Sequence, residues 1–193
     1  ELEAFQDWIQ IIHHPARLGY GAALKTGIRA ARGNLIAFCD LDATYEPLDL
    51  LAMMECLRDS GIRMVIGDRL HDLKNMPVSR SLGNFLFRGS IHFLFGQRVM
   101  DSCSGLRLFR AEDAEFFTQG LPDQLNFSLA MTLKLLRSGH RFMEVPIHYY
   151  RRLGSSKLKL ARDGIRFFST IIHYRLFKLE AIAAVASSQA ASK

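Results

Sequence analysis

Alternation between short apolar runs and helical segments constrains the fold of this chain more than any other feature of its sequence. Apolar runs of strand length occur at 35–39 and 63–67, and segments with helical spacing occur at 22–32 and 47–60. Strands that alternate with helices in this way predict an α/β fold built on a mainly parallel sheet. Further strands are predicted at 8–12, 105–109 and 141–150, and further helices at 79–95, 127–138 and 158–178.

The 193 residues are expected to form one domain, and a hydrophobic content of 49% is enough to bury a core. Residues 1–157 are predicted to make up this domain, followed by an amphipathic helix over 158–178 and a flexible tail over 179–193. The predicted strand at 8–12 is of a kind that normally lies deep inside an open α/β sheet. The domain is therefore expected to be N-terminally truncated.

Positive charge is concentrated in the last third of the sequence. The formal net charge is +6, yet residues 137–178 alone carry ten Lys or Arg against two Asp or Glu. Such a segment predicts one face that meets phosphate groups on a nucleic acid, an anionic membrane or a phosphorylated substrate. Nucleic acid is disfavoured, because no recognition motif is present and the aromatic side chains follow an apolar stripe. The three cysteines lack metal-binding spacing and are expected to stay reduced in a cytosolic setting.

Two aspartates follow the apolar run 35–39, at the edge where a parallel sheet binds its ligands. Asp40 and Asp42 are separated by one residue, so strand alternation predicts that both carboxylates lie on one face. Two like charges at close range need a cation or a donor between them, unless they are solvated at the strand end. Paired carboxylates favour Mg²⁺ or Mn²⁺, which commonly complete their coordination with water and substrate phosphates. The short motif alone leaves both interpretations open.

Four segments of the chain carry a family resemblance: 17–42, which ends in the Asp-Leu-Asp motif, 101–109 (DSCSGLRLF), 144–147 (EVPI) and 151–158 (RRLGSSKL). In this order they resemble the core of family-2 glycosyltransferases with the GT-A fold. Within that family they most resemble the polyprenyl-phosphate glycosyltransferase branch, similar to dolichol-phosphate mannose synthase. Two departures are visible: Arg17 stands where the family often has Asn, and the family's base-recognising strands would precede Glu1.

The resemblance implies an inverting transfer of a sugar from a nucleotide-sugar donor. It implies that Asp40 and Asp42 bind a divalent metal ion, Mg²⁺ or Mn²⁺, together with the donor diphosphate, and that Asp42 contacts the metal more directly. Asp101 matches the acidic position that serves as a catalytic base or orients the acceptor. A cap on the turn that follows Asp101 is the alternative interpretation.

The expected acceptor is a polyprenyl phosphate, a dolichyl or undecaprenyl phosphate. The second pKa of such a phosphate, about 6, leaves its nucleophilic oxygen largely ionised at neutral pH. This nucleophile needs cationic and hydroxyl donors to position it more than it needs a strong base. The residues expected to bind the acceptor phosphate are Arg107, Arg151, Ser156 and Lys157.

The predicted helix over 158–178 indicates how a lipid acceptor is reached. At about 100° per residue it carries an apolar stripe flanked by basic residues, a pattern typical of a helix in a membrane interface. An ordinary helix packed on the domain has the same pattern, and this alternative stays open. The stripe is Ala161, Ile165, Phe168, Ile172 and Leu176, and the flank holds Lys159, Arg162, Arg166 and His173.

These features predict a metal-dependent glycosyltransferase that is cytoplasmic and peripheral at the inner face of the membrane, where an anionic surface and a polyprenyl phosphate are its partners. One alternative is a family-2 transferase that acts on a saccharide or another non-lipid acceptor. A second alternative, from a different class, is a non-catalytic fragment that binds an anionic membrane or a nucleic acid.

Overall fold

A four-stranded mixed sheet organises the structure, a computed structural model that describes residues 9–154 and 160–177. The strand order is β1–β3–β2–β4, with β2 and β4 parallel and β3 antiparallel to both of its neighbours. The α/β class is confirmed, and β1, β2 and β4 run in one direction as predicted, but the insertion of β3 makes the sheet mixed. The strands are β1 (Leu35–Phe38), β2 (Ile62–Asp68), β3 (Arg107–Arg110) and β4 (Arg141–Pro146).

The central position of β2 follows from its apolar sequence. Met64, Val65 and Ile66 are completely buried, because β2 has a neighbouring strand on each side and apolar cores on both faces. Strand alternation sends Met64 and Ile66 into the larger core together with Phe109 of β3. Val65 points the other way, into a smaller core that it shares with Leu108.

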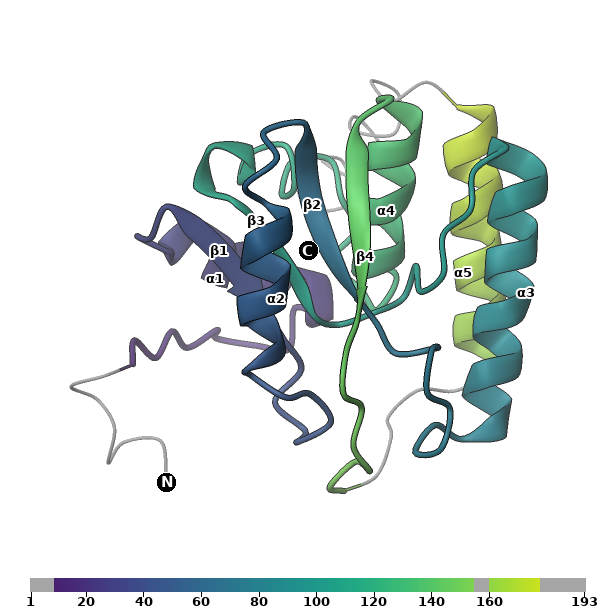
Figure 1. Ribbon diagram of the computed structural model, residues 1–193, viewed down its shortest axis with the longest axis horizontal. Coiled ribbons are helices and arrows are strands. Elements are labelled where there is room, and N and C mark those ends of the chain that lie inside the picture. Colours follow the sequence, from purple (N-terminus) through teal and green to yellow (C-terminus); the bar gives the residue numbers. More distant parts are fainter. Residues whose placement is uncertain (1–8, 155–159, 178–193) are drawn as a thin grey trace.

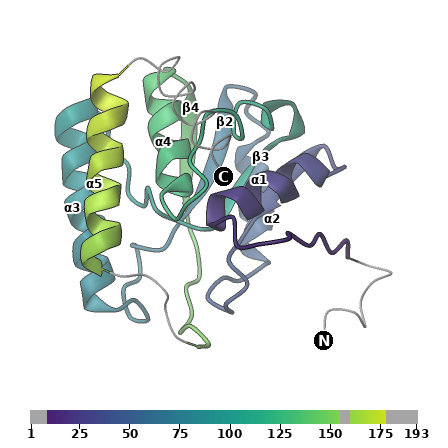
Figure 2. The same cartoon turned by 180° about the vertical axis from the view of Figure 1, so that it is seen from behind.

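Helices cover both faces of this sheet (Figures 1 and 2). α2 packs over the smaller core through Met53, whereas α1 and α4 cover the opposite face and the larger core. α3 and α5 lie side by side beyond α4, and all the α-helices match sequence predictions to within a few residues. They are α1 (Tyr20–Ala30), α2 (Asp49–Cys56), α3 (Val78–Phe95), α4 (Phe127–Arg137) and α5 (Leu160–Leu176), and a short 3-10 helix, η2 (Ala111–Asp113), follows β3.

α5 is held to the domain by a face that differs from the predicted apolar stripe. Phe167, Ile171 and Tyr174 pack into the larger core. Three residues of the predicted stripe, Ile165, Ile172 and Leu176, are 72%, 46% and 71% exposed instead, whereas the ring of Phe168 contacts Phe87 of α3. α5 is therefore both an ordinary packed helix and a carrier of surface apolar side chains.

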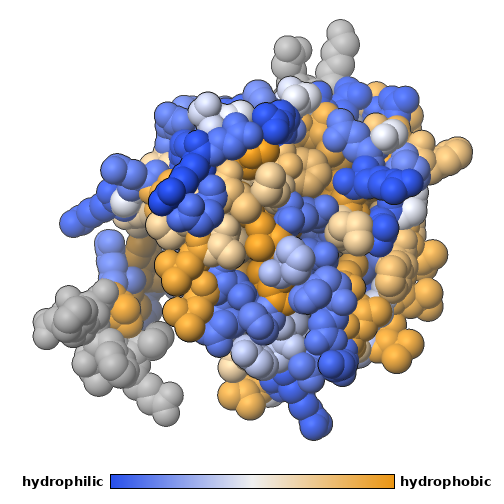
Figure 3. Space-filling model, in the orientation of Figure 1, coloured by the Kyte–Doolittle hydropathy of each residue, from blue (hydrophilic) through white to orange (hydrophobic). Residues whose placement is uncertain are grey.

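α3 adds a second apolar surface beside that of α5. Val78 and Phe93 of this helix are 83% and 86% exposed. Figure 3 shows apolar side chains gathered along the edge of the molecule where Figure 1 places α3. Within residues 9–154 and 160–177, no helix is long and apolar enough to cross a membrane.

The prediction of a strand at 8–12 is wrong for residues 9–12, the part of this segment that the structure describes. Residues 9–12 do not pair with the sheet, and Ile9 and Ile12 are 39% and 43% exposed. An apolar run becomes a strand only where a sheet edge supplies partners for its backbone groups. The predicted strand at 141–150 also ends early, and an isolated bridge joins Tyr45 and Tyr149 beyond it.

Candidate active site

Asp40 lies in a tight slot between α1 and the segment that leads into β3. The hydroxyl of Tyr20 donates a hydrogen bond to Asp40 Oδ1 over 3.0 Å. Burial, and then the nearby Asp40 charge, raise the pKa of Tyr20, so this hydroxyl remains a donor. On the other side, a Cβ at Gly105 would lie 2.6 Å from Asp40 Oδ2. Only a residue without a side chain allows the backbone to approach this carboxylate so closely.

Asp42 has different partners, because the chain has left the strand before it reaches this residue. β1 ends at Phe38, so strand alternation does not extend to the two aspartates and does not give them a common face. The Thr44 hydroxyl donates to Asp42 Oδ1 over 2.5 Å, and the Arg152 guanidinium forms an ion pair with Oδ2. Both carboxylates still lie near Cys39, where burial and then these two charges raise the pKa of the thiol.

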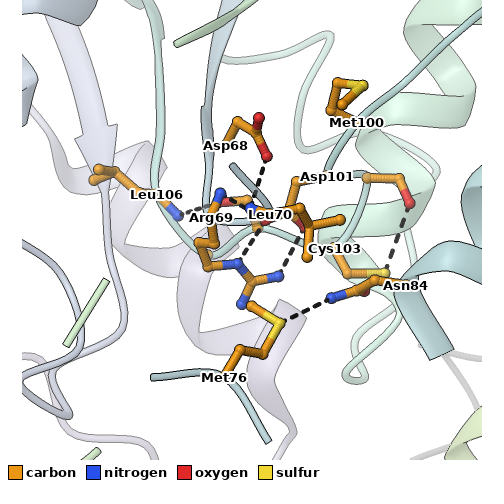
Figure 4. A network of polar contacts seen from close by, with 12 residues as sticks. Asp68, Arg69, Leu70, Met76, Asn84, Met100, Asp101, Cys103 and Leu106 are labelled. Atoms are coloured by element: carbon orange, nitrogen blue, oxygen red, sulfur yellow. Dashed lines mark hydrogen bonds and ion pairs between the residues drawn. The ribbon is translucent and has the colours of Figure 1, made fainter. Parts of the chain in front are cut away.

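Asp101 is completely buried and is paired with Arg69 (Figure 4). Arg69 Nε donates to Asp101 Oδ2 over 2.6 Å, and Arg69 Nη2 donates to Oδ1 over 2.8 Å. This two-pronged geometry is the strongest form of an arginine–carboxylate contact. Both oxygens of Asp101 are therefore engaged by a guanidinium in this structure, which fits a carboxylate that orients a neighbouring group.

Glu144, from the EVPI segment, holds the loop that carries Asp101. Its carboxylate accepts hydrogen bonds from the backbone N–H groups of Met100, over 2.8 Å, and of Asp101, also over 2.8 Å. Burial raises the pKa of Glu144, although these two backbone donors act in the opposite direction. Two motifs that are far apart in the sequence, at 101–109 and 144–147, thus meet through this carboxylate.

Arg69 is a candidate site residue that the sequence analysis did not select, although its position after the predicted strand 63–67 was a signal. Its guanidinium is held by Asp101 on one side and lies 5.6 Å from the centre of the Tyr149 ring. Burial opposes the charge of Arg69, but the Asp101 carboxylate outweighs it and holds the pKa of Arg69 well above its usual range. The residue therefore presents a permanent, oriented positive charge.

Arg107 does not lie where the sequence predicted it. Its side chain has no exposed surface, and burial lowers its pKa to about 10. The guanidinium donates to the carbonyl oxygens of Ser102 and Ser104 over 2.8 and 3.1 Å, and to the Thr132 hydroxyl over 3.0 Å. Arg107 thus braces the loop at 101–104, and this placement does not match the predicted contact with an acceptor phosphate.

The RRLGSSKL segment places its second arginine at the site. Arg151 is exposed, whereas Arg152 is partly buried and forms the ion pair with Asp42. Sequence reasoning selected the first arginine because it fits the spacing of the family motif, whereas the side that each arginine faces is set by the packing of this segment. The predicted residues Ser156 and Lys157, together with Lys159, the side chain of Ala161 and the tail at 179–193, lie outside the described residues.

These elements surround a cavity of about 600 Å³ that is lined by both charged and apolar side chains. Asp40, Arg69 and Arg152 make up what is called its charged end here, and Arg80 of α3 and Asp163 of α5 are further charged residues of the lining. The rest of the lining comes mainly from α3, α4 and α5 and is largely apolar. Its apolar members are Met76, Leu82, Leu86, Phe87, Leu125, Leu129, Phe167 and Phe168.

The carboxylates of Asp40 and Asp42 fit a hard divalent cation that keeps open coordination positions. Asp40 and Asp42 supply carboxylate oxygens, the ligands that Mg²⁺ and Mn²⁺ prefer. Among the described residues, no three His, Cys, Asp or Glu side chains converge as a complete cage for a metal. Mg²⁺ and Mn²⁺ commonly complete such a partial set of carboxylate ligands with water and substrate phosphates.

The fold is that of a GT-A glycosyltransferase domain. The sequence profile described as Glycosyl transferase family 2 matches residues 1–117, and the chain belongs to this family. The resemblance stated from the sequence motifs is thereby confirmed at the level of the family.

Relatives of the chain include proteins named for sugar transfer to polyprenyl phosphates. It is 31% identical over 144 residues to a dolichyl-phosphate hexose transferase of Haloferax volcanii, covering 72% of this chain and 60% of that protein. It is 28% identical over 161 residues to an undecaprenyl-phosphate mannosyltransferase of Micrococcus luteus, covering 78% and 65%. The chain thus spans about three fifths of the length of these relatives.

Solved structures support the fold. Glucosyl-3-phosphoglycerate synthase from Mycobacterium tuberculosis, solved with Mn²⁺, UDP-glucose and phosphoglyceric acid, superposes with a TM-score of 0.65. The sequence identity is 16%, and the match covers 92% of this chain and 65% of that one. At this identity the likeness establishes a shared fold only.

Proposed function

We propose that this chain carries the catalytic site of a glycosyltransferase that moves a sugar from a nucleotide-sugar donor to a polyprenyl phosphate. The observation that carries the proposal is the cavity, whose charged end suits phosphates and whose apolar walls suit an isoprenoid chain. The names of the Haloferax volcanii and Micrococcus luteus relatives describe acceptors of this chemistry.

Asp40 and Asp42 are proposed to hold a divalent cation, Mg²⁺ or Mn²⁺, at the charged end. Such an ion, when bound, offsets the negative charge of the donor diphosphate as it leaves. Tyr20 and Gly105 keep the Asp40 carboxylate in place from two sides. This rigidity favours catalysis, since a site that is already organised needs no rearrangement when charge develops.

Arg69 and Arg80 are proposed to receive the acceptor phosphate, because both are basic residues that line the same cavity as Asp40. The phosphate is largely ionised at neutral pH, so its oxygen can attack the sugar carbon without a strong base. Asp101 is then a positioning residue that orients Arg69. Attack from the face opposite the leaving diphosphate inverts the sugar carbon. Contacts of Arg151, Ser156 and Lys157 with the acceptor remain predictions.

The lipid chain is proposed to run between α3 and α5 toward the surface. Leu82 and Leu86 of α3 and Phe168 of α5 line the cavity and are 59%, 52% and 38% exposed, so they belong to both the cavity wall and the outer surface. Basic side chains near this surface favour an anionic membrane. The cytoplasmic, peripheral location at the inner membrane face stays a prediction.

A phosphorylated acceptor without a lipid is the second candidate. The Mycobacterium tuberculosis structures with a similar fold contain phosphoglyceric acid, a small acceptor of this kind. The charged end of the cavity would serve such an acceptor equally well, and only the apolar walls separate the two proposals.

Transfer of a radiolabelled sugar from a nucleotide sugar, with Mn²⁺ or Mg²⁺ present, tests the proposal. Dolichyl or undecaprenyl phosphate and 3-phosphoglycerate are supplied as alternative acceptors, and the lipid is expected to be labelled. Labelling of 3-phosphoglycerate alone would favour the second candidate.

Asp42→Ala is expected to abolish this transfer, and the matched control is Glu112→Gln. Glu112 is an exposed acidic residue in η2, beyond the end of β3 that lies away from the aspartates. The control is expected to keep full activity. Activity retained in Asp42→Ala would contradict the metal assignment.

A further inference from the structure

Two segments from opposite halves of the chain are paired beside Asp42. The backbone N–H of Tyr150 donates to the carbonyl oxygen of Thr44 over 2.9 Å, and that of Leu153 donates to the carbonyl oxygen of Asp42 over 3.1 Å. The Tyr45–Tyr149 bridge extends this antiparallel contact. The backbone is therefore fixed on both sides of residue 152, and the side chain of Arg152 is delivered to Asp42.

The contact between Arg152 and Asp42 is an ion pair without good hydrogen-bond geometry. Arg152 Nη2 lies against Asp42 Oδ2, while Thr44 occupies Oδ1. Among the described residues, neither Asp42 Oδ2 nor Arg152 Nε, both buried atoms, has a hydrogen-bond partner. The pair is thus held by charge, and each member keeps an unused capacity for a better partner.

Arg152 also contributes to the lining of the cavity that Asp40 and Arg69 share. Its side chain is 29% exposed and that of Asp42 is 17% exposed, so the guanidinium can leave the carboxylate without crossing packed core. An arginine that turns away from Asp42 would add its planar set of donors to the charged end. That geometry suits a phosphate, which accepts two parallel hydrogen bonds from a guanidinium.

We infer that Arg152 is a placeholder for the divalent cation on Asp42, and that binding of the cation sends its guanidinium into the cavity to bind a phosphate group. This inference rests on the proposed function, because it uses the same two aspartates as metal ligands. A cation of charge +2 on Asp42 attracts the carboxylate and repels the guanidinium, so the two positive partners compete for one oxygen. Metal binding and phosphate binding are then coupled through one side chain.

Manganese binding measured by electron paramagnetic resonance of free Mn²⁺ tests this competition without an activity assay. Arg152→Gln removes the competitor and is expected to bind Mn²⁺ about threefold more tightly than the unaltered chain. This factor corresponds to the energy of a partly exposed ion pair, which the cation no longer has to break. Arg152→Lys keeps a positive partner for Asp42 and is expected to stay close to the unaltered affinity. Arg151→Gln is the matched control, since it removes the same charge from the exposed neighbour.

The inference is overturned if Arg152→Gln binds Mn²⁺ with unchanged or lower affinity, or if Arg151→Gln tightens binding equally. In the first case the metal assignment to Asp42 stands, and only the displacement of Arg152 fails. If neither the unaltered chain nor Arg152→Gln binds Mn²⁺, the inference and the metal part of the proposed function fail together.

The Nε–Hε nuclear magnetic resonance signal of Arg152, assigned by its loss in Arg152→Lys, provides a direct second measurement. Addition of Mg²⁺ is expected to shift this signal, and inorganic phosphate added afterwards is expected to shift it again. A signal that does not move with Mg²⁺, in a chain that binds the ion, would show that Arg152 stays on Asp42 and would overturn the inference.

Discussion

Replacing Asp101 by Asn is expected to destabilise the fold strongly, because it breaks a buried ion pair and leaves one charge behind. The side chain of Asp101 is fully buried and that of Arg69 is 10% exposed. Removing one partner of such a pair costs about 3–5 kcal/mol. For a chain of this length that loss lowers the melting temperature by about 6–20 °C. Urea unfolding followed by circular dichroism measures the free energy directly.

A double-mutant cycle separates the interaction energy of the Asp101–Arg69 pair from the other effects of each substitution on stability. Arg69→Met alone leaves the Asp101 carboxylate unpaired, and combining it with Asp101→Asn is expected to cost less than the sum by about 2 kcal/mol. Glu55→Gln, which breaks the exposed Arg58–Glu55 pair, is the control and is expected to cost under about 1 kcal/mol. A cost below about 1 kcal/mol for Asp101→Asn, or additive single mutants, would refute the reasoning.

Three further outcomes are expected. Gly83 lines the cavity, and a Cβ at this position would meet nothing within 4 Å. The Gly83→Leu variant should therefore fold normally, as measured by its melting temperature. Because its side chain enters the cavity, it should lower the affinity for a long-chain acceptor more than the affinity for inorganic phosphate. Phe93→Ser should weaken cosedimentation of the chain with anionic vesicles. The control Leu48→Ser, which changes a residue that is 69% exposed at the start of α2, should leave cosedimentation unchanged. Equal effects of the two substitutions would contradict membrane contact through α3. Hydrogen bonding to Asp49 raises the pKa of His148. The contact between the two residues therefore stabilises the fold below pH 6.5, and this stabilisation is lost as the pH rises through the raised pKa. His148→Asn should reduce the pH dependence of the free energy of unfolding, measured by denaturant titrations at several pH values.

The helices and the central strands could be predicted from the sequence because their signals are local. The buried run of β2 and the spacing of α1 to α5 depend on residues close in the chain. The place of β3 could not be predicted, since a short strand of four residues contains no information about which neighbours it joins. The same reason explains the wrong strand at 8–12, where an apolar run finds no partner.

The candidate site likewise contains some residues that could be selected from the sequence and others that could not. Asp40 and Asp42 could be selected as candidates because a motif and a predicted strand end coincide, and Asp40 lines the cavity. Arg107 matched a motif equally well, yet it is buried and donates a hydrogen bond to Thr132 of α4, and no local pattern encodes this contact. The choice of Arg152 over its neighbour depends on a backbone pairing with a segment a hundred residues earlier.

The insertion of β3 also has a consequence for how the chain is made. β1 and β2 both pair with β3 and not with each other, although β3 is synthesised last of the three. A nascent chain that ends before residue 107 therefore contains Asp40 and Arg69 but has no strand to join the two halves of its sheet. Pairing between distant segments is slow, and open strand edges are prone to aggregate in the meantime. Newly synthesised chains are thus expected to depend on chaperones until the strand that completes the sheet has emerged from the ribosome.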